Sequence, residues 1–250
     1  MRRHTKPGGG LSCLLTVLVG VLLTGCANRG ANPQTNDVLF FVPGVAGDGG
    51  GYDGLIRGLR KGGVSAHIEV VGWGAPGPLF VMNFQDEGIH RGAEEKLAKL
   101  MTDWRAAHPG GRIDVIAHSA GCGVTLGALR RAGTPAARTV VLLNPSVSPG
   151  YPIGEAAANV TGVMHVFHSD RDTFFLAWRT STFGTYDNVK TKAAGNVGFE
   201  VGEDLTGKVV QHPRDEQWAK QGNDGSHFGT LAEEFAEQTI APVLQAGSNE

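Results

Sequence analysis

The sequence predicts an α/β protein whose central sheet is mostly parallel and carries helices on both faces. Short apolar runs, such as residues 38–42, are bounded by glycine or proline and indicate buried strands. Stretches with apolar residues at helical spacing alternate with these runs, as in parallel sheets. The chain has 250 residues, of which 41% are hydrophobic and 18% charged, so it can bury a large core. We expect one folded domain over residues 37–250.

Each element is predicted from its own pattern. The first strand ends at Pro43 and Gly44, and the helix at 92–108 ends at Pro109 with two glycines behind it. The other strands are apolar or β-branched runs, and the other helices have a periodic apolar face. In chain order we expect strand 38–42, helix 52–61, strand 67–73, helix 92–108, strand 112–117, helix 120–131, strand 139–144, strand 163–168, strand 207–212 and a closing helix at 228–244.

Charge and motifs exclude several classes of function. The net charge is -2, and no basic stretch follows the first ten residues, so nucleic acid is not an expected partner. The run "GVAGDGGG" lacks the Gly-Lys-Ser/Thr ending of a phosphate-binding loop. His165 and His168 lie three apart on a predicted strand and therefore face opposite sides. We expect no metal and no cofactor.

The N-terminus has the layout of a secretory signal. Three basic residues in the first ten precede an apolar run that is too short to span a bilayer comfortably and ends at Cys26. The stretch Leu23-Thr24-Gly25-Cys26 resembles the bacterial lipobox, which implies a signal peptide at residues 1–25, acylation of Cys26 and a polar tether at 26–36. The expected location is then the bacterial cell envelope, at the outer membrane or periplasmic face, with the lipid bilayer as partner. The alternative is an ordinary signal peptide in which the cysteine occurs by chance.

Residues capable of chemistry follow the predicted strands. Ligands of parallel sheets gather at the carboxyl ends of the strands. Gly44 and Val45 follow the first strand, Ser119 follows the third, Asn144 ends the fourth, and Asp170 and Asp172 follow the fifth. We therefore expect the functional site at this edge of the sheet.

Ser119 lies where a predicted strand becomes a helix. A sharp turn there would expose the hydroxyl but crowd the backbone two residues before and two residues after it. The residues at those positions are Ala117 and Gly121, both small. The alternative role for Ser119 is that of a helix cap.

The stretch "AHSAG" matches the nucleophile elbow in its relaxed form, and the chain here resembles the α/β-hydrolase superfamily, in particular its serine esterases and lipases. The resemblance implies a three-layer α/β-hydrolase fold and a catalytic triad in the chain order serine, acid, histidine. His227 in "DGSHFGTL" would be the general base for Ser119. Asp172 would orient His227, and Asp170 is the alternative acid.

The same resemblance implies an oxyanion hole formed by the backbone N–H groups of Val45 and Ala120. Pro43-Gly44 stands where related proteins often have His-Gly, which leaves open whether Val45 or Ala46 donates. Gly44, Trp73 and His118 are candidate substrate-binding residues, with packing as the alternative for Trp73 and His118.

The function expected from the sequence is a cell-envelope serine hydrolase that cleaves a small carboxylic ester through an acyl-enzyme on Ser119. An acyltransferase that uses the same triad is one alternative. A non-catalytic envelope binding protein on a hydrolase scaffold is the other. We expect a monomer.

Overall fold

The computed structural model describes residues 35–45, 47, 51–75, 77–133, 135–173 and 184–246. Its centre is a six-stranded sheet of order β2-β1-β3-β4-β5-β6, in which every neighbouring pair is parallel. The strands are β1 (Val38–Val42), β2 (His67–Val70), β3 (Ile113–His118), β4 (Thr139–Leu143), β5 (Met164–His168) and β6 (Val209–Pro213). β1, β3 and β4 are buried along their whole length, as expected for strands covered on both faces.

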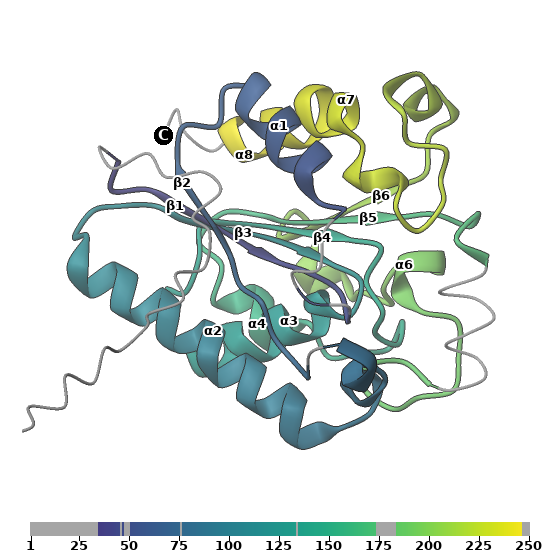
Figure 1. Cartoon of the computed structure of the whole chain (residues 1–250), viewed down its shortest axis with the longest axis horizontal. Helices are drawn as coiled ribbons and strands as arrows, with labels where there is room; N and C mark the ends of the chain where they lie inside the picture. Colours follow the sequence, from purple (N-terminus) through teal and green to yellow (C-terminus); the bar gives the residue numbers. More distant parts are fainter. Residues whose placement is uncertain are drawn as a thin grey trace, which may run out of the picture.

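Helices cover both faces of this sheet (Figure 1). One face carries α1 (Asp53–Lys61), α7 (Glu233–Phe235) and α8 (Ala241–Ala246), and its core includes Leu55 and Phe235. The other face carries α2 (Glu87–Ala107), α3 (Gly121–Arg131) and α4 (Gly154–Ala158), and its core includes Leu97 and Val124. The predicted fold class, with its three layers, is thus confirmed.

Shorter helical segments lie between these elements. They are the 3-10 helices η1 (Gly77–Phe84), η3 (Glu203–Leu205), η4 (Glu216–Gln221) and η5 (Gly229–Leu231), the short helix α6 (Ala194–Val197) and the π-helix η6 (Ala236–Ile240). The sequence patterns predicted none of them separately. Among the described residues, no helix is both long enough and apolar enough to cross a membrane.

The strand order places a topological switch point between β1 and β3. The chain leaves β1 toward β2 on one side and returns to β3 on the other, so the segments that follow β1 and β3 diverge there. Such a point is where open parallel sheets leave a crevice for ligands. Gly44 and Ser119 both lie at it, at the carboxyl edge of the sheet.

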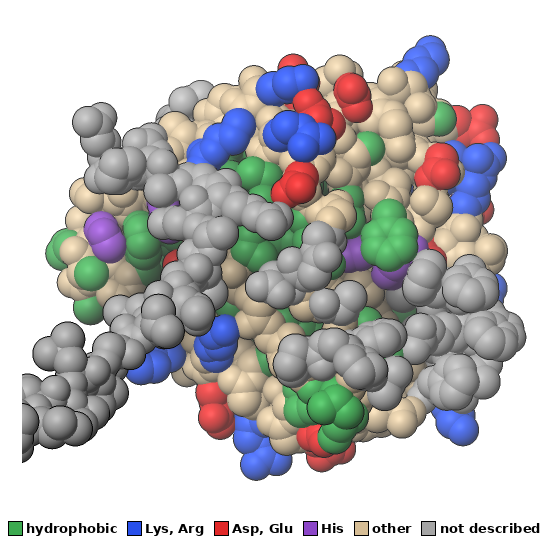
Figure 2. Space-filling view, viewed as in Figure 1, with side chains coloured by type: hydrophobic (Ala, Val, Ile, Leu, Met, Phe, Trp, Pro, Cys, Tyr) green, Lys and Arg blue, Asp and Glu red, His purple; other side chains and the backbone are tan. Residues whose placement is uncertain are grey.

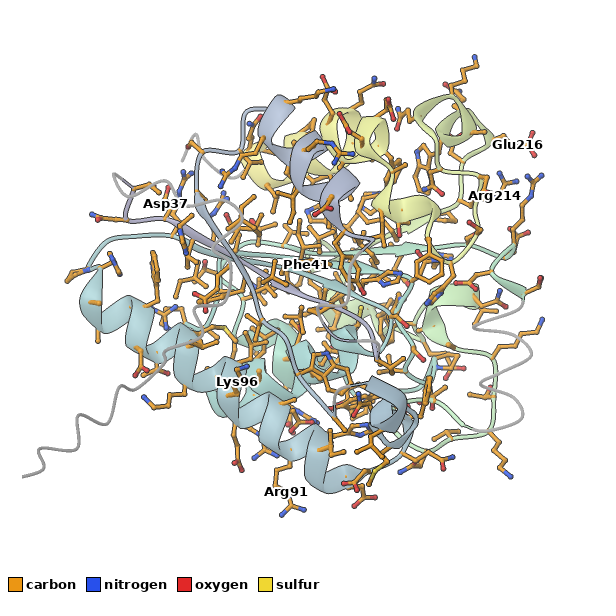
Figure 3. All side chains as sticks on the ribbon, viewed as in Figure 1. Asp37, Phe41, Arg91, Lys96, Arg214 and Glu216 are labelled. Carbon is orange, nitrogen blue, oxygen red and sulfur yellow. The ribbon has the colours of Figure 1, made fainter. Side chains whose placement is uncertain are left out.

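The opposite edge of the sheet receives the N-terminal chain. Asp37, labelled in Figure 3, precedes β1 and forms an ion pair of 2.5 Å with Arg112, which precedes β3. On the face shown in Figure 2, cationic and anionic side chains are interspersed and do not form a basic stripe.

Three predicted elements differ clearly from the observed ones. Helix α2 begins at Glu87 and not at residue 92, because the carboxylate of Asp86 accepts the backbone N–H of Ile89 at 2.9 Å and caps the helix there. Strand β2 ends at Val70 and not at residue 73. The closing helix is interrupted by the extended residue Ala232, and its C-terminal half contains the π-helix η6.

Several predictions fall outside the described residues. They are the signal peptide at 1–25, the lipidation site Cys26 and all but the last two residues of the tether at 26–36.

Candidate active site

Ser119 occupies the turn between β3 and α3 with a positive φ of 56°, a backbone region that residues other than glycine seldom adopt. Its N–H donates to the Leu143 carbonyl at 3.0 Å, which ties the turn to β4. A Cβ atom on Gly121 would lie 2.4 Å from the carbonyl oxygens of Val42 and Pro43. The close approach of the β1 end to α3 therefore accounts for the glycine two residues after Ser119.

The structure brings Ser119, His227 and Asp172 into one hydrogen-bonded row. His227 Nε2 lies 3.0 Å from Ser119 Oγ, and His227 Nδ1 lies 2.6 Å from Asp172 Oδ2. Since an ionised carboxylate only accepts, Nδ1–H donates to Asp172 and the Nε2 lone pair faces the serine hydroxyl. The three residues are 8%, 6% and 2% exposed, so the whole row is largely shielded from bulk water.

Asp170, the alternative acid, does not join this row. Its side chain is 85% exposed and lies 3.6 Å from Arg214. Asp172 is instead enclosed at the end of the turn that follows β5, where its backbone N–H donates to the Ser169 carbonyl. The structure thus places Asp172, and not Asp170, against the histidine.

Two further side chains hold the acid, and the sequence did not reveal their role. Asn144 Nδ2 donates to Asp172 Oδ2 at 3.2 Å, and Thr230 Oγ1 donates to Asn144 Oδ1 at 2.8 Å. Asn144 has a φ of 48° at the end of β4, a conformation that asparagine tolerates better than most residues. Its place after a strand was the only signal in the sequence. The contact to Asp172 joins residues far apart in the chain.

The loop after β1 lies directly against the serine. We call Pro43, Gly44 and Val45 the β1 loop. A Cβ atom on Gly44 would be 3.1 Å from Ser119 Cβ and 3.6 Å from its Oγ, so a side chain here would crowd the nucleophile. The N–H of Gly44 already donates to the Tyr52 hydroxyl at 3.2 Å.

That bond leaves the N–H groups of Val45 and Ala120 as the candidates for an oxyanion hole. Ala120 directly precedes α3, where helical N–H groups have no partner within the helix. Ala46, which the sequence left as the alternative donor to Val45, is outside the described residues.

His118 binds the backbone of the loop that carries His227. The ring is 1% exposed, and its Nε2 lies 2.9 Å from the His227 carbonyl oxygen, to which it donates. Burial, together with the neighbouring His227, lowers the pKa of His118 to about 3, so the ring is neutral at ordinary pH. A direct substrate contact, one of the two roles predicted for His118, does not fit this burial; the alternative, packing, does.

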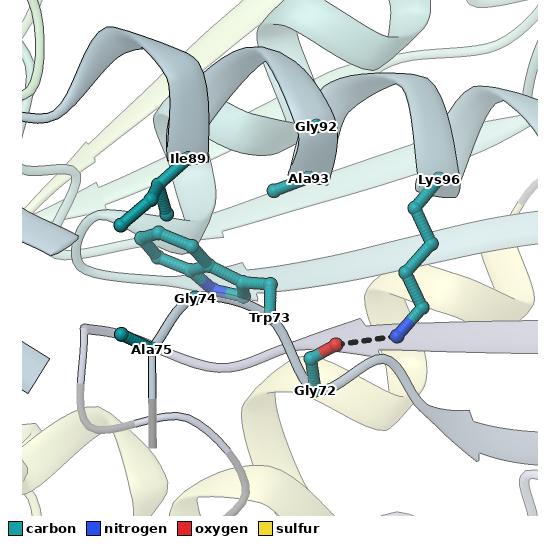
Figure 4. Close-up of a pocket in the computed structure, with 8 residues that line it drawn as sticks. All are labelled: Gly72, Trp73, Gly74, Ala75, Ile89, Gly92, Ala93 and Lys96. Carbon is teal, nitrogen blue, oxygen red and sulfur yellow. Dashed lines mark hydrogen bonds between the residues drawn. The ribbon is translucent and has the colours of Figure 1, made fainter. Parts of the chain in front are cut away.

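Trp73 is buried beside the β1 loop and lines a groove. Its indole N–H donates to the Pro43 carbonyl at 2.7 Å, and the residue is 7% exposed. The groove, of about 420 Å³, lies between the segment after β2 and helix α2 (Figure 4). Lys96 closes one end with a 2.7 Å hydrogen bond to the Gly72 carbonyl. The groove is lined by Gly72, Trp73, Gly74, Ala75, Ile89, Gly92, Ala93 and Lys96.

Within the part of the chain that the structure describes, no group of three or more His, Cys, Asp or Glu side chains is arranged to hold a metal ion. His165 and His212 do pair, with Nδ1 and Nε2 3.0 Å apart, but they lie on β5 and β6 without a third ligand among the described residues. Cys122, the second residue of α3, is fully buried, and burial raises the pKa of its thiol.

The parallel sheet, the strained serine turn after β3 and the ordered serine, acid and histidine define the α/β-hydrolase fold, and this chain has it. A similar solved structure is lipase B of Aspergillus fumigatus, 13% identical with a TM-score of 0.53 over 82% of this chain and 51% of the lipase. The chain thus spans about half the length of that lipase. At such identity the likeness shows the fold alone.

Two other solved structures are less similar in shape. Esterase PE8 is 12% identical, with a TM-score of 0.49 over 85% of this chain and 93% of the esterase. XC6422 of Xanthomonas campestris, described as an α/β serine hydrolase without a lid, is 15% identical, with a TM-score of 0.49 over 87% of this chain and 84% of that protein. No protein-family model matches the sequence, and no curated protein matches it either.

Proposed function

We propose that this chain is a serine hydrolase that cleaves a carboxylic ester through an acyl-enzyme on Ser119. The observation that carries the proposal is the row of 3.0 Å and 2.6 Å contacts from Ser119 Oγ through His227 to Asp172, built on a strained turn at the carboxyl edge of the sheet. A structural serine needs neither the strain nor a buried imidazole–carboxylate pair behind it.

In the acylation step, Ser119 Oγ attacks the ester carbonyl carbon while its proton passes to His227 Nε2. The carbonyl oxygen becomes an oxyanion, which the N–H groups of Val45 and Ala120 stabilise. The bond to the alcohol oxygen then breaks, and His227 Nε2–H protonates the leaving alcohol. Asp172 stabilises the transient imidazolium and keeps Nδ1 protonated.

Deacylation repeats this path with water. A water molecule loses a proton to His227 Nε2 and adds to the acyl carbon, and the bond to Ser119 Oγ breaks. The carboxylic acid leaves, and His227 returns the proton to Oγ. An acceptor alcohol in place of water would give the acyl transfer that the sequence left as an alternative.

The experiment is covalent labelling of the full chain in detergent with a fluorophosphonate, followed by peptide mass spectrometry. We expect one adduct, on Ser119, and none in Ser119→Ala. Ser226→Ala is the matched control because this exposed serine lies next to His227, and its labelling should equal wild type. Labelling that survives in Ser119→Ala, or none in the wild-type chain, would favour the binding-protein alternative.

The substrate we propose is a small ester with an apolar group. Phe228, next to His227, is 55% exposed, and its ring centroid lies 5.2 Å from that of His227 and 5.8 Å from that of His118. An exposed aromatic ring beside the general base offers apolar contact to the acyl or alcohol group of an ester. Neither a cofactor nor a metal ion enters the proposed steps.

We also propose that the protein is a monomer, tethered to the bacterial cell envelope through acylated Cys26. The support is the signal-like N-terminus and the lipobox-like "LTGC". The tether would join the sheet at the amino end of β1, the edge opposite Ser119, which would turn the site away from the anchoring bilayer. Cys26→Ser should abolish incorporation of radiolabelled palmitate and release the protein from the membrane fraction; unchanged fractionation would contradict the anchor.

A further inference from the structure

Among the described residues, four hydrogen bonds fix the β1 loop, and three of them involve side chains. Trp73 holds the Pro43 carbonyl and Tyr52 holds the Gly44 N–H, as described above. The Gly44 carbonyl accepts the Gly47 N–H at 3.0 Å. The fourth bond is the one from Asn83 Nδ2 to the Val45 carbonyl, at 2.9 Å.

Asn83 is buried to 1% exposure at the end of η1 and uses its whole carboxamide. Besides the Val45 carbonyl, Nδ2 reaches the Ala75 carbonyl at 3.2 Å, and Oδ1 accepts the Ala75 N–H at 2.7 Å. A Cβ atom on Gly74 would lie 2.4 Å from Nδ2, and Gly74 has a φ of 81°. The backbone at Gly74 is therefore shaped to admit this side chain.

The segment that carries Asn83 is itself anchored. His90 Nε2 lies 2.9 Å from the Asn83 carbonyl oxygen, to which it donates, and the His90 ring stacks on Tyr186 with centroids 3.9 Å apart. Tyr186 in turn donates to Glu94 at 3.0 Å. Asn83 thus connects the β1 loop to a packed network between α2 and Tyr186, which lies in the segment after β5.

We propose that Asn83 is a positioning residue that sets the orientation of the Val45 N–H in the oxyanion hole. The proposal rests on the proposed function. In a trans peptide the N–H points opposite to the carbonyl, so the bonded Gly44 carbonyl sets the direction of the Val45 N–H. If the Val45 backbone rotated, its N–H would no longer point into the oxyanion hole. The hydrogen bond from Asn83 to the Val45 carbonyl holds the peptide that follows Val45 and so opposes this rotation.

The test compares Asn83→Ala and Asn83→Asp with wild type, in the full chain in detergent, on p-nitrophenyl butyrate. Asn83→Asp keeps the shape and the acceptor for the Ala75 N–H but loses the donor to Val45. Since loss of an oxyanion donor costs about 100-fold or more, we expect a misdirected one to lower kcat by about 10- to 100-fold. KM should stay within about threefold, because the contact acts in the transition state.

A second readout separates positioning from general destabilisation. Affinity for a trifluoromethyl ketone, which forms an oxyanion adduct with a catalytic serine, should fall by the same factor as kcat/KM. Asn159→Ala is the matched control because its carboxamide also donates to a backbone carbonyl, that of Leu129, but away from the β1 loop. It should keep wild-type kcat.

Near-UV circular dichroism checks the folding of each variant. If Asn83→Ala loses the wild-type spectrum, the kinetics of Asn83→Asp decide the test. Wild-type kcat and inhibitor affinity in a folded Asn83 variant would overturn the positioning role while the hydrolase function stands. Failure of the wild-type chain to hydrolyse any ester, with no labelling of Ser119, would overturn both.

Discussion

Asn144 and His227 bind the same carboxylate oxygen: Asp172 Oδ2 accepts from Asn144 Nδ2 at 3.2 Å and from His227 Nδ1 at 2.6 Å. The carboxylate of Asp172, the proposed acid, is therefore oriented by Asn144 at the end of β4 as well as by His227. Asn144 also adopts a φ of 48°, so its side chain and its backbone contribute separately.

Asn144→Gly and Asn144→Ala separate these contributions. Both lose the bond to Asp172, and we expect both to lower kcat by about 10-fold, because a hydrogen bond to a charged group is worth about 1.5–3 kcal/mol. The Cβ atom of alanine also makes the left-handed backbone at this position unfavourable, whereas glycine adopts it freely. Asn144→Ala should therefore be less stable than Asn144→Gly by about 1 kcal/mol. Denaturant titration and steady-state kinetics measure the two effects. Equal stability of the variants would contradict the backbone argument.

His227→Ala should reduce turnover by about 10⁴-fold or more, because the serine then has no base. The fold should survive, since the site lies at the edge of the core. Steady-state hydrolysis of p-nitrophenyl acetate provides the rate. A loss of less than tenfold would show that another group takes the serine proton.

The two aspartates should behave differently. Asp172→Asn should lower kcat by about 10³- to 10⁴-fold, because an amide in that position favours the wrong histidine tautomer. Asp170→Asn is the matched control and should stay within about twofold of wild type, since that side chain is 85% exposed. The reverse order of effects would assign the acid to Asp170.

Acid should destabilise the protein through buried histidines. Burial lowers the pKa of His90, His118, His165, His168 and His212, that of His165 to about 4. The unfolded chain then binds more protons than the folded chain below about pH 6.5, so the free energy of unfolding falls as pH drops from there toward 4. His165→Gln should flatten this dependence. Thermal unfolding at pH 7.5, 6, 5 and 4 tests it, and an unchanged slope would contradict the assignment.

Phe228→Ala should change substrate preference and leave the chemistry intact. We expect kcat/KM for p-nitrophenyl octanoate to fall several-fold more than for the acetate, because only the longer chain would reach the exposed ring. Val197→Ala removes another exposed apolar side chain and should affect neither ester. Equal losses for both esters would place Phe228 outside the acyl path.

Much of the fold was predictable because buried parallel strands carry continuous apolar runs. β1 and β4 have such runs, and β3, which Ser119 follows, is apolar at Ile113, Val115, Ile116 and Ala117. The start of α2 was not predicted, since its N-cap, Asp86, precedes two glycines that weaken the helical signal. The irregular closing region was not predicted either, because packing against α1 determines it and local propensity does not.

The residues of the site also divide into those that the sequence predicts and those that it does not. Ser119, Asp172 and His227 occur in short motifs whose order along the chain is informative. Asn83, Tyr52 and Thr230 carry no such signal, because their partners are backbone groups or side chains brought near only by folding, 38 residues away for Asn83 and 86 for Thr230. Residues of this kind need coordinates to be recognised.

The most direct measurement is a crystal structure of the protein after inactivation by diethyl p-nitrophenyl phosphate. The proposed function predicts phosphorus bonded to Ser119 Oγ, with the phosphoryl oxygen accepting hydrogen bonds from the N–H groups of Val45 and Ala120. An unmodified Ser119 in crystals of treated protein, or a phosphoryl oxygen directed away from both N–H groups, would contradict it.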